Sequence, residues 1–266
     1  MGKEKIYTSS DRISKIIAWV IIVLVFLIYY SVMALLAPAR KMEAMKSEYG
    51  FRQDEKNPVD ERVFTDSAYL ELLREKSFLQ SRVAMAETDS IYLTVNLPDS
   101  TVNLEISGVI VHKAYIRKMD ISRIFKGGNN YVILSMLSRP LTISKNFASI
   151  EKEPLMIKMA PKDTSEYVPD IIPDTADYEP VNFIMEMENG TRLHIYQEGN
   201  LKPGDGIRRS LFDLYHRLRY SINTFIRVIT FRVPDYQPFI KLRIPRSDAK
   251  IIFKALPEHG QIGVYI

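Results

Sequence analysis

The chain has 266 residues, of which 36 are Lys or Arg and 32 are Asp or Glu, giving a formal net charge of +4. This small basic excess is spread along the sequence, whereas binding to a nucleic-acid backbone needs a concentrated basic surface, so we expect no nucleic-acid partner. Cysteine is absent, which excludes disulfides, thiolate metal sites and a cysteine nucleophile.

An apolar run begins at Ile16 and ends at Leu36, and it contains no charged residue, glycine or proline. A helix rises about 1.5 Å per residue, so this run would cover roughly the 30 Å of hydrocarbon in a bilayer. We therefore expect a transmembrane helix at residues 16–37, preceded by a cytoplasmic stub at residues 1–15. Two alternatives stay open, a buried core helix and a cleavable signal peptide, since the small residues around Pro38 resemble a cleavage site.

The orientation of this helix is predicted from the layout of the chain rather than from charge. Basic residues flank the run almost equally, so the positive-inside rule decides little. They are Lys3, Lys5, Arg12 and Lys15 before the run, and Arg40, Lys41 and Lys46 after it. Because a short segment precedes the run and most of the sequence follows it, we expect the N-terminus in the cytoplasm. The helix would lie in the inner (cytoplasmic) membrane and the C-terminal domain in the periplasm.

Residues 38–88 are predicted to form a juxtamembrane helix and a linker. Gly50 and Asn57-Pro58 interrupt the polar stretch after the apolar run, and Asp66 can cap a second helix at residues 67–86. Apolar residues recur along that helix with roughly helical spacing, at Tyr69, Leu70, Leu73, Leu79 and Val83. We expect this stripe to pack on its own domain. The alternative is a stalk or oligomerisation helix in which Leu73 contacts a partner.

Residues 89–266 are predicted to form a β-rich domain. Apolar and polar residues alternate at residues 91–97, 101–106 and 109–116, with turn residues between them, which predicts a β-meander. His112 within it is expected to be a packing residue rather than a ligand. A loop that lacks the Gly-Lys-Ser/Thr ending of a phosphate-binding loop is expected at residues 125–130, followed by strands beginning at Tyr131 and Leu141.

Residues 154–180 are rich in proline and acidic residues and are predicted to form a solvated, semi-extended insertion. The acidic residues could bind a cation, but their spacing does not match a calcium-binding EF-hand loop. No pair of histidines has metal-ligand spacing either, so we expect no metal and no cofactor.

A hairpin is expected next, with strands at residues 181–187 and 191–196 joined through Asn189-Gly190, and then an amphipathic helix at residues 208–223. The helix is predicted to turn four apolar residues inward, namely Leu211, Leu214, Tyr215 and Leu218. Its basic flank consists of Arg208, Arg209, Arg217 and Arg219. This flank is either a solvated face or a contact for a partner or an anionic surface. A further strand is expected at residues 225–233.

The sequence from Phe239 to Ile266 predicts a strand, a helix capped by Ser247, a turn and a final strand. This block resembles the end of the L,D-transpeptidase (YkuD-type) catalytic domain, where a Ser-His-Gly-Cys-Ile-Arg-Leu stretch precedes a helix, a Pro-Gly turn and a short strand. The meander after Ser90 resembles the first strands of that domain. The resemblance implies an α+β, mainly β domain of mixed sheets with short helices.

The resemblance places Lys241 where the family has its cysteine nucleophile, and Arg243 on the arginine of the motif. His194 would correspond to an upstream histidine of the family. Because the family's reaction needs a thiolate activated by a histidine, and the chain has no cysteine, the resemblance implies a degenerate domain without that activity. The sequence also lacks Gly-x-Ser-x-Gly and His-Glu-x-x-His motifs.

We therefore expect a non-catalytic, single-pass membrane subunit of a bacterial cell-envelope assembly, for example a type VI-like secretion membrane complex. Its periplasmic domain would be a protein-docking scaffold within a homo-oligomer or a hetero-complex. One alternative is a peptidoglycan-binding pseudoenzyme in which Lys241 and Arg243 pair with carboxylates. The other is a divergent cell-wall enzyme that uses His194, His216 or unpaired carboxylates.

Overall fold

The computed structural model describes residues 9–50, 66–152, 180–198 and 204–266. The insertion predicted at residues 154–180 lies outside the described residues, apart from Pro180. The chain divides into two compact units. Unit 1 comprises Met1–Ala44 and Arg217–Tyr236, and unit 2 comprises Met45–His216 and Gln237–Ile266.

Unit 1 is built from two helical segments. α1 (Ser9–Tyr49) contributes its residues up to Ala44, and α5 (Asp205–Ile229) contributes its second half. The segments pack through aromatic side chains, with the ring centroids of Phe26 and Phe225 6.0 Å apart. Pro38 lies inside α1 without ending it.

α1 confirms the prediction of one long apolar helix near the N-terminus. Among the described residues it is the one helix that is long and apolar enough to cross a membrane. Only 6% of its most apolar window is buried, whereas the core helix of a soluble protein would be mostly buried. The length and composition of α1 also fit a signal sequence, which is the other alternative drawn from the sequence.

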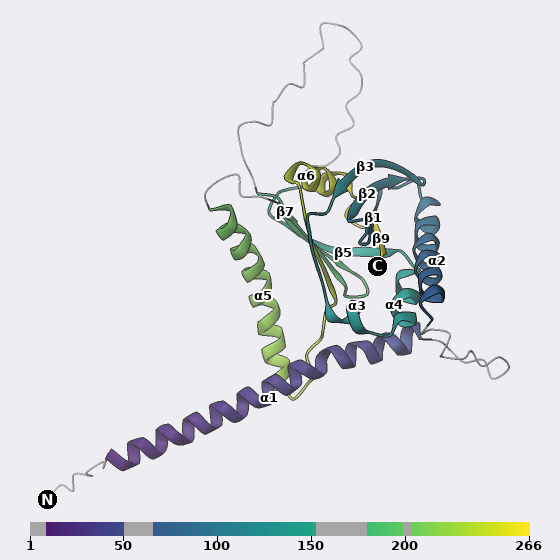
Figure 1. Cartoon of the computed structure of the whole chain (residues 1–266). Helices are drawn as coiled ribbons and strands as arrows, with labels where there is room; N and C mark the ends of the chain where they lie inside the picture. The colour runs from purple at the N-terminus through teal and green to yellow at the C-terminus, as the bar shows by residue number, and fades with distance from the viewer. Residues whose placement is uncertain (1–8, 51–65, 153–179, 199–203) are drawn as a thin grey trace, which may run out of the picture. The chain divides into compact units, whose positions relative to one another are not determined.

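Unit 2 is an α+β structure around one large mixed sheet, as Figure 1 shows. The strand order is β3-β2-β1-β9-β5-β6-β7-β8-β4. The pairs β1–β9 and β7–β8 are parallel and the other neighbouring pairs are antiparallel. The strands are β1 (Tyr92–Asn96), β2 (Thr101–Ile106), β3 (Val109–Tyr115), β4 (Lys118–Ile121), β5 (Leu141–Ala148), β6 (Asn182–Met187), β7 (Arg192–Gln197), β8 (Phe239–Ile244) and β9 (Gln261–Tyr265).

Helices cover parts of this sheet and bury its central strands. α2 (Ser67–Ala86) and α4 (Asn130–Leu137) contact each other and β9, while α6 (Arg246–Ala255) contacts β7. The short α3 (Arg123–Gly127) connects β4 to α4. β6 and β7 are buried along almost their whole length, although their register places the polar residues Glu186, Arg192 and His194 on one face. The expected meander and the expected hairpin are both confirmed, as β1–β2–β3 and β6–β7.

Two strand predictions were wrong because short apolar runs do not distinguish a strand from a buried helix. The residues from Tyr131 onward form α4, which begins where the side chain of Asn129 accepts a hydrogen bond from the backbone N–H of Val132 at 3.1 Å. α4 is buried on most sides, so its sequence shows no polar face. Residues 225–233 are the end of α5 and the turn after it, where Phe231 has a φ of 56°. Part of the loop predicted at residues 125–130 is α3.

The inward side predicted for α2 was wrong in the second half of the helix, whereas Tyr69, Leu70 and Leu73 in the first half are half-buried. Its buried residues are Ser77, Ser81 and Met85, whereas Leu79 and Val83 are exposed. A Cβ added at Gly263 of β9 would lie 2.6 Å from Cε of Met85 and 3.4 Å from Oγ of Ser81. Small residues thus face the sheet because the helix approaches β9 too closely for larger ones.

The prediction of which side of α5 faces inward was also wrong. Leu211, Leu214, Tyr215 and Leu218 are all exposed. In the half of the helix that belongs to unit 2, Phe212 and His216 are half-buried instead, and their ring centroids lie 4.7 Å apart. The four apolar residues predicted from the sequence do form a stripe on α5, but their side chains are exposed.

A buried carboxylate fastens α2 to the meander. Glu105 accepts hydrogen bonds from Arg82 Nε at 2.7 Å, Thr94 Oγ1 at 2.6 Å and the Tyr92 hydroxyl at 3.2 Å. Arg82 also donates to the carbonyl of Gly108 at 3.2 Å, which fixes the β2–β3 turn against the helix. The charge of Glu105 is almost fully buried and is paired and hydrogen-bonded at once, as such burial requires.

We predict that Glu105→Ala lowers the free energy of unfolding by about 3 kcal/mol, because it leaves Arg82 and two buried hydroxyls without their acceptor. Urea unfolding of the full chain in detergent, followed by circular dichroism, measures this. The control Glu71→Ala changes an exposed carboxylate of α2, the helix that carries Arg82, and should stay within about 0.5 kcal/mol of the parent. Equal losses for the two variants would contradict the structural role of Glu105.

Candidate functional site

The structure brings together two of the residues singled out from the sequence. β7 and β8 run parallel, and their register places His194 directly opposite Lys241. Neighbouring residues in register point to the same face of the sheet. Asp213, from the first half of α5, lies over this face, with its Oδ1 3.7 Å from Nζ of Lys241. Tyr196, two residues after His194 on β7, completes the cluster.

The hydrogen bonds in the cluster form one directed chain. The Tyr196 hydroxyl donates to Asp213 Oδ1 at 2.8 Å, so its single proton is already used. Nδ1 of His194, 2.9 Å from the same hydroxyl oxygen, must therefore donate its proton to it. The ammonium of Lys241 then balances the charge of Asp213. Within this chain each polar group has a partner, which is typical of a structural network that holds α5 on the sheet.

His194 is neutral in this setting. Burial, and after it the positive charge of Lys241, lowers the pKa of its imidazole to about 3, against the opposing effect of Asp213. The ring also lies edge-on to Phe239, with centroids 6.2 Å apart. A histidine with this pKa does not act as a proton donor near neutral pH, and its Nδ1 proton is committed to Tyr196.

Phe239, Lys241 and Arg243 share one face of β8, because residues two apart in a strand point the same way. Nζ of Lys241 lies 5.2 Å from the centre of the Phe239 ring, within reach of a cation–π interaction. Arg243 lies opposite Tyr196 in the β7–β8 register and is half-buried. Both candidate cations thus lie in one row next to His194.

The other residues singled out from the sequence are not part of this cluster. Leu73 is half-buried on α2, Arg208 is exposed and Arg209 is half-buried on α5. Arg217 and Arg219 belong to the half of α5 in unit 1. His216 packs between the rings of Phe147 and Phe212, with centroids 5.0 and 4.7 Å away, so it contributes to packing in unit 2.

Two members of the cluster were missed from the sequence. Tyr196 could have been found, because it lies two residues after His194 in a predicted strand and so had to share its face. Asp213 could not, since it comes from a helix whose inward side was predicted wrongly. In the described parts of the chain, no group of three or more His, Asp or Glu side chains is placed to hold a metal ion.

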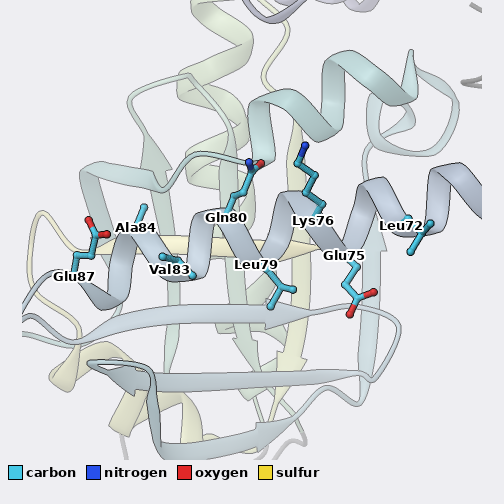
Figure 2. Close-up of a pocket in the computed structure, with 8 residues that line it drawn as sticks. All are labelled: Leu72, Glu75, Lys76, Leu79, Gln80, Val83, Ala84 and Glu87. Carbon is cyan, nitrogen blue, oxygen red and sulfur yellow. The ribbon is translucent and has the colours of Figure 1, made fainter.

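A second feature of unit 2 is an exposed apolar surface, which we name the corner patch: Leu72, Leu79 and Val83 of α2, and Val109, Ile110 and Val111 of β3. These six side chains are between 45% and 66% exposed. Figure 2 shows the α2 part, where Leu72, Leu79 and Val83 line a shallow pocket on the outer side of the helix. The bond from Arg82 to Gly108 keeps the start of β3 close to α2.

No family model, no curated protein and no solved structure matches the chain. The resemblance to L,D-transpeptidases therefore rests on the residues of the C-terminal block and of the meander alone.

The depressed pKa of His194 predicts how stability depends on pH. An unfolded histidine binds a proton near pH 6.5, whereas His194 in the folded chain does so only near pH 3. The contribution of His194 to the free energy of unfolding is therefore complete above pH 6.5. It is lost as the pH falls toward 3, by about 1.4 kcal/mol per pH unit. His194→Gln should flatten this part of the profile in urea unfolding at pH 7, 6 and 5. His259→Gln, a control at another histidine, should keep the slope of the parent, and equal slopes for both variants would refute the assignment.

Proposed function

We propose that the chain is a non-catalytic, membrane-anchored docking subunit of a bacterial cell-envelope assembly, such as a type VI-like secretion membrane complex. α1 would be its single anchor, with the N-terminus in the cytoplasm and unit 2 in the periplasm. The observation that carries the proposal is the corner patch. Soluble domains that act alone rarely leave many large aliphatic side chains uncovered on two neighbouring elements, and such exposure is typical of protein interfaces.

The position of β3 supports the same proposal. β3 is the first strand in the order of the described sheet, so one of its edges has no neighbouring strand there. Such an edge offers unpaired backbone groups to another chain, and proteins usually protect it with charges or prolines. Val109, Ile110 and Val111 offer no such protection. A partner protein that covers α2 and the start of β3 would bury this apolar surface.

The polar cluster supports a non-catalytic role. Asp213 and Lys241 are paired with each other, and the proton of His194 is committed to Tyr196. A nucleophile would need Lys241 or Asp213 released toward a substrate, and a pKa near 3 makes the second ring nitrogen of His194 a weak general base at neutral pH. The absence of cysteine removes the chemistry implied by the resemblance.

Charged substitutions in the corner patch test the docking role. We predict that Val83→Asp and Leu79→Asp each reduce recovery of the partner protein by about tenfold, because an interface would have to bury an unpaired carboxylate. The measurement is gentle detergent extraction of the tagged full chain, followed by its mass in solution and quantification of the proteins that accompany it. Ser90→Asp adds the same charge to an exposed position outside the patch and should retain the partner. Unchanged recovery with all three variants would contradict the proposal.

A second candidate function is the binding of peptidoglycan stem peptides. It is favoured by one observation, the row formed by Lys241 and Arg243 on one face of β8 beside His194. Guanidinium and ammonium groups in such a row can pair with the carboxylates of a peptide. Because Lys241 already pairs with Asp213, Arg243 would make the main contact.

This candidate predicts that the detergent-solubilised full chain pellets with insoluble cell-wall sacculi at low salt, and that Arg243→Gln reduces the pelleted fraction several-fold. Arg123→Gln, at an exposed position of α3, is the matched control and should leave pelleting unchanged. If the parent chain stays in the supernatant at low salt, this function is excluded.

A further inference from the structure

α5 carries a stripe of large apolar side chains that are 46% to 67% exposed. We name it the α5 stripe; its residues are Ile207, Leu211, Leu214, Tyr215, Leu218, Ile222, Phe225, Ile226 and Ile229. The positions repeat every 11 residues, so that Ile207, Leu218 and Ile229 are equivalent. Eleven residues in three turns correspond to about 3.67 residues per turn, close to the 3.6 of an α-helix, so the stripe stays on one side over the whole helix.

The rest of α5 is polar and basic. Between Asp205 and Ile229 the helix has five arginines and two aspartates. At about 100° per residue, Arg208 and Arg219 fall at one border of the α5 stripe and Arg217 beyond the other. A helix with an apolar side, arginines along its borders and few acids has the composition of helices that lie in a membrane interface.

Contacts within unit 1 identify the surface that this helix meets. The end of α5 contacts α1, the helix that is long and apolar enough to cross a membrane, through Phe225 and Val228. The Tyr29 hydroxyl donates to the carbonyl of Val228 at 3.3 Å, and the Tyr29 and Phe231 rings lie 5.7 Å apart. Phe26 and Tyr29 belong to the apolar run, so the C-terminal end of α5 contacts the segment that is expected in the membrane.

The turn after α5 fits a position at the membrane. The guanidinium of Arg227 is paired with the carboxylate of Asp235, with the closest atoms 2.6 Å apart, and the Tyr220 hydroxyl donates to the carbonyl of Asp235. The one arginine near the end of the helix is thus paired with a carboxylate next to the residues of α5 that contact α1.

We infer that α5 is an interfacial helix, with the α5 stripe embedded in the bilayer that α1 spans and its bordering arginines on the phosphates of anionic lipid headgroups. The inference rests on the membrane anchor of the proposed function, and it adds a lipid-binding surface that is distinct from the corner patch. A bilayer is favoured over a protein partner because the apolar side continues the surface of the apolar helix against which α5 packs. Arginine-bordered helices gain both apolar burial and attraction to anionic lipid there.

The absence of cysteine allows a direct test with the full chain, because each introduced cysteine is the only one. A polarity-sensitive fluorophore is attached at Leu218→Cys on the α5 stripe, at Arg209→Cys on the opposite side of α5, or at Val25→Cys in α1. Each protein is reconstituted into vesicles of phosphatidylcholine and phosphatidylglycerol. Quenching is measured with a spin label carried on the lipid and with iodide in the water.

The expected result is roughly threefold stronger lipid quenching at position 218 than at position 209, with weak iodide quenching at position 218, because the stripe would lie about 5 to 10 Å below the headgroup level. Replacing phosphatidylglycerol with phosphatidylcholine should reduce the lipid quenching at position 218 about twofold. Position 25 reports the anchor by itself, and quenching there by lipid confirms that α1 is in the bilayer.

The outcomes separate the two proposals. If position 25 is quenched by lipid but position 218 is quenched by iodide, or by neither quencher, α5 is solvated or covered by protein and the inference is overturned while the anchor stands. If position 25 is not quenched by lipid, the anchor itself fails and the inference fails with it. Lipid quenching at position 218 that does not depend on phosphatidylglycerol would refute the role of the arginines.

Discussion

The close approach of α2 to β9 decides which surfaces of unit 2 are available. With no side chain at Gly263, the helix can lie against the strand, but only small or flexible residues fit between them, as Ser81 and Met85 do. Leu72, Leu79 and Val83 of α2 are therefore turned outward. The same helix is held in place through Arg82 and the buried carboxylate of Glu105. Packing density at one contact thus creates the apolar surface on which the docking proposal is built.

The polar cluster of His194, Tyr196, Asp213 and Lys241 connects α5 to β7 and β8. Its carboxylate comes from α5, and its other members come from the two parallel strands that α5 joins. Tyr196 links the neutral histidine to the paired charges, and Asp213 holds the helix to the sheet through two contacts, one with the Tyr196 hydroxyl and one with the Lys241 ammonium. Such a network fixes the start of α5, while the end of the same helix packs on α1 in unit 1.

Much of the fold could be predicted from the sequence, wherever one face of an element is polar. The meander, the β6–β7 hairpin and the final strand–helix–strand block all have this character. α4 could not be predicted because burial on most sides removes the helical pattern. The inward faces of α2 and α5 were assigned on the rule that apolar residues face the core, and both chains of reasoning failed for the same reason. Each helix has large apolar side chains that are exposed, and sequence alone does not distinguish them from side chains that face the core.

The candidate site was predictable only where strand register decides it. His194 and Lys241 were proposed from the resemblance, and the parallel pairing of β7 with β8 places them side by side. Asp213 depends on how α5 is rotated, and this rotation is set by Phe212 and His216 packing on unit 2. Rotation of a helix about its axis follows from tertiary contacts and not from local pattern.

The position of β9 has a consequence for how the protein is made. β9 lies between β1 and β5, near the middle of the sheet, although its residues are the last of the described strands in sequence. Until residue 265 has been synthesised, the β1–β2–β3 meander and the remaining strands have no common neighbour to join them. Folding of the sheet therefore depends on contacts between residues far apart in sequence, which form slowly, and strand edges stay open in the meantime. A nascent chain of this topology has reason to depend on chaperones until its synthesis has passed β9.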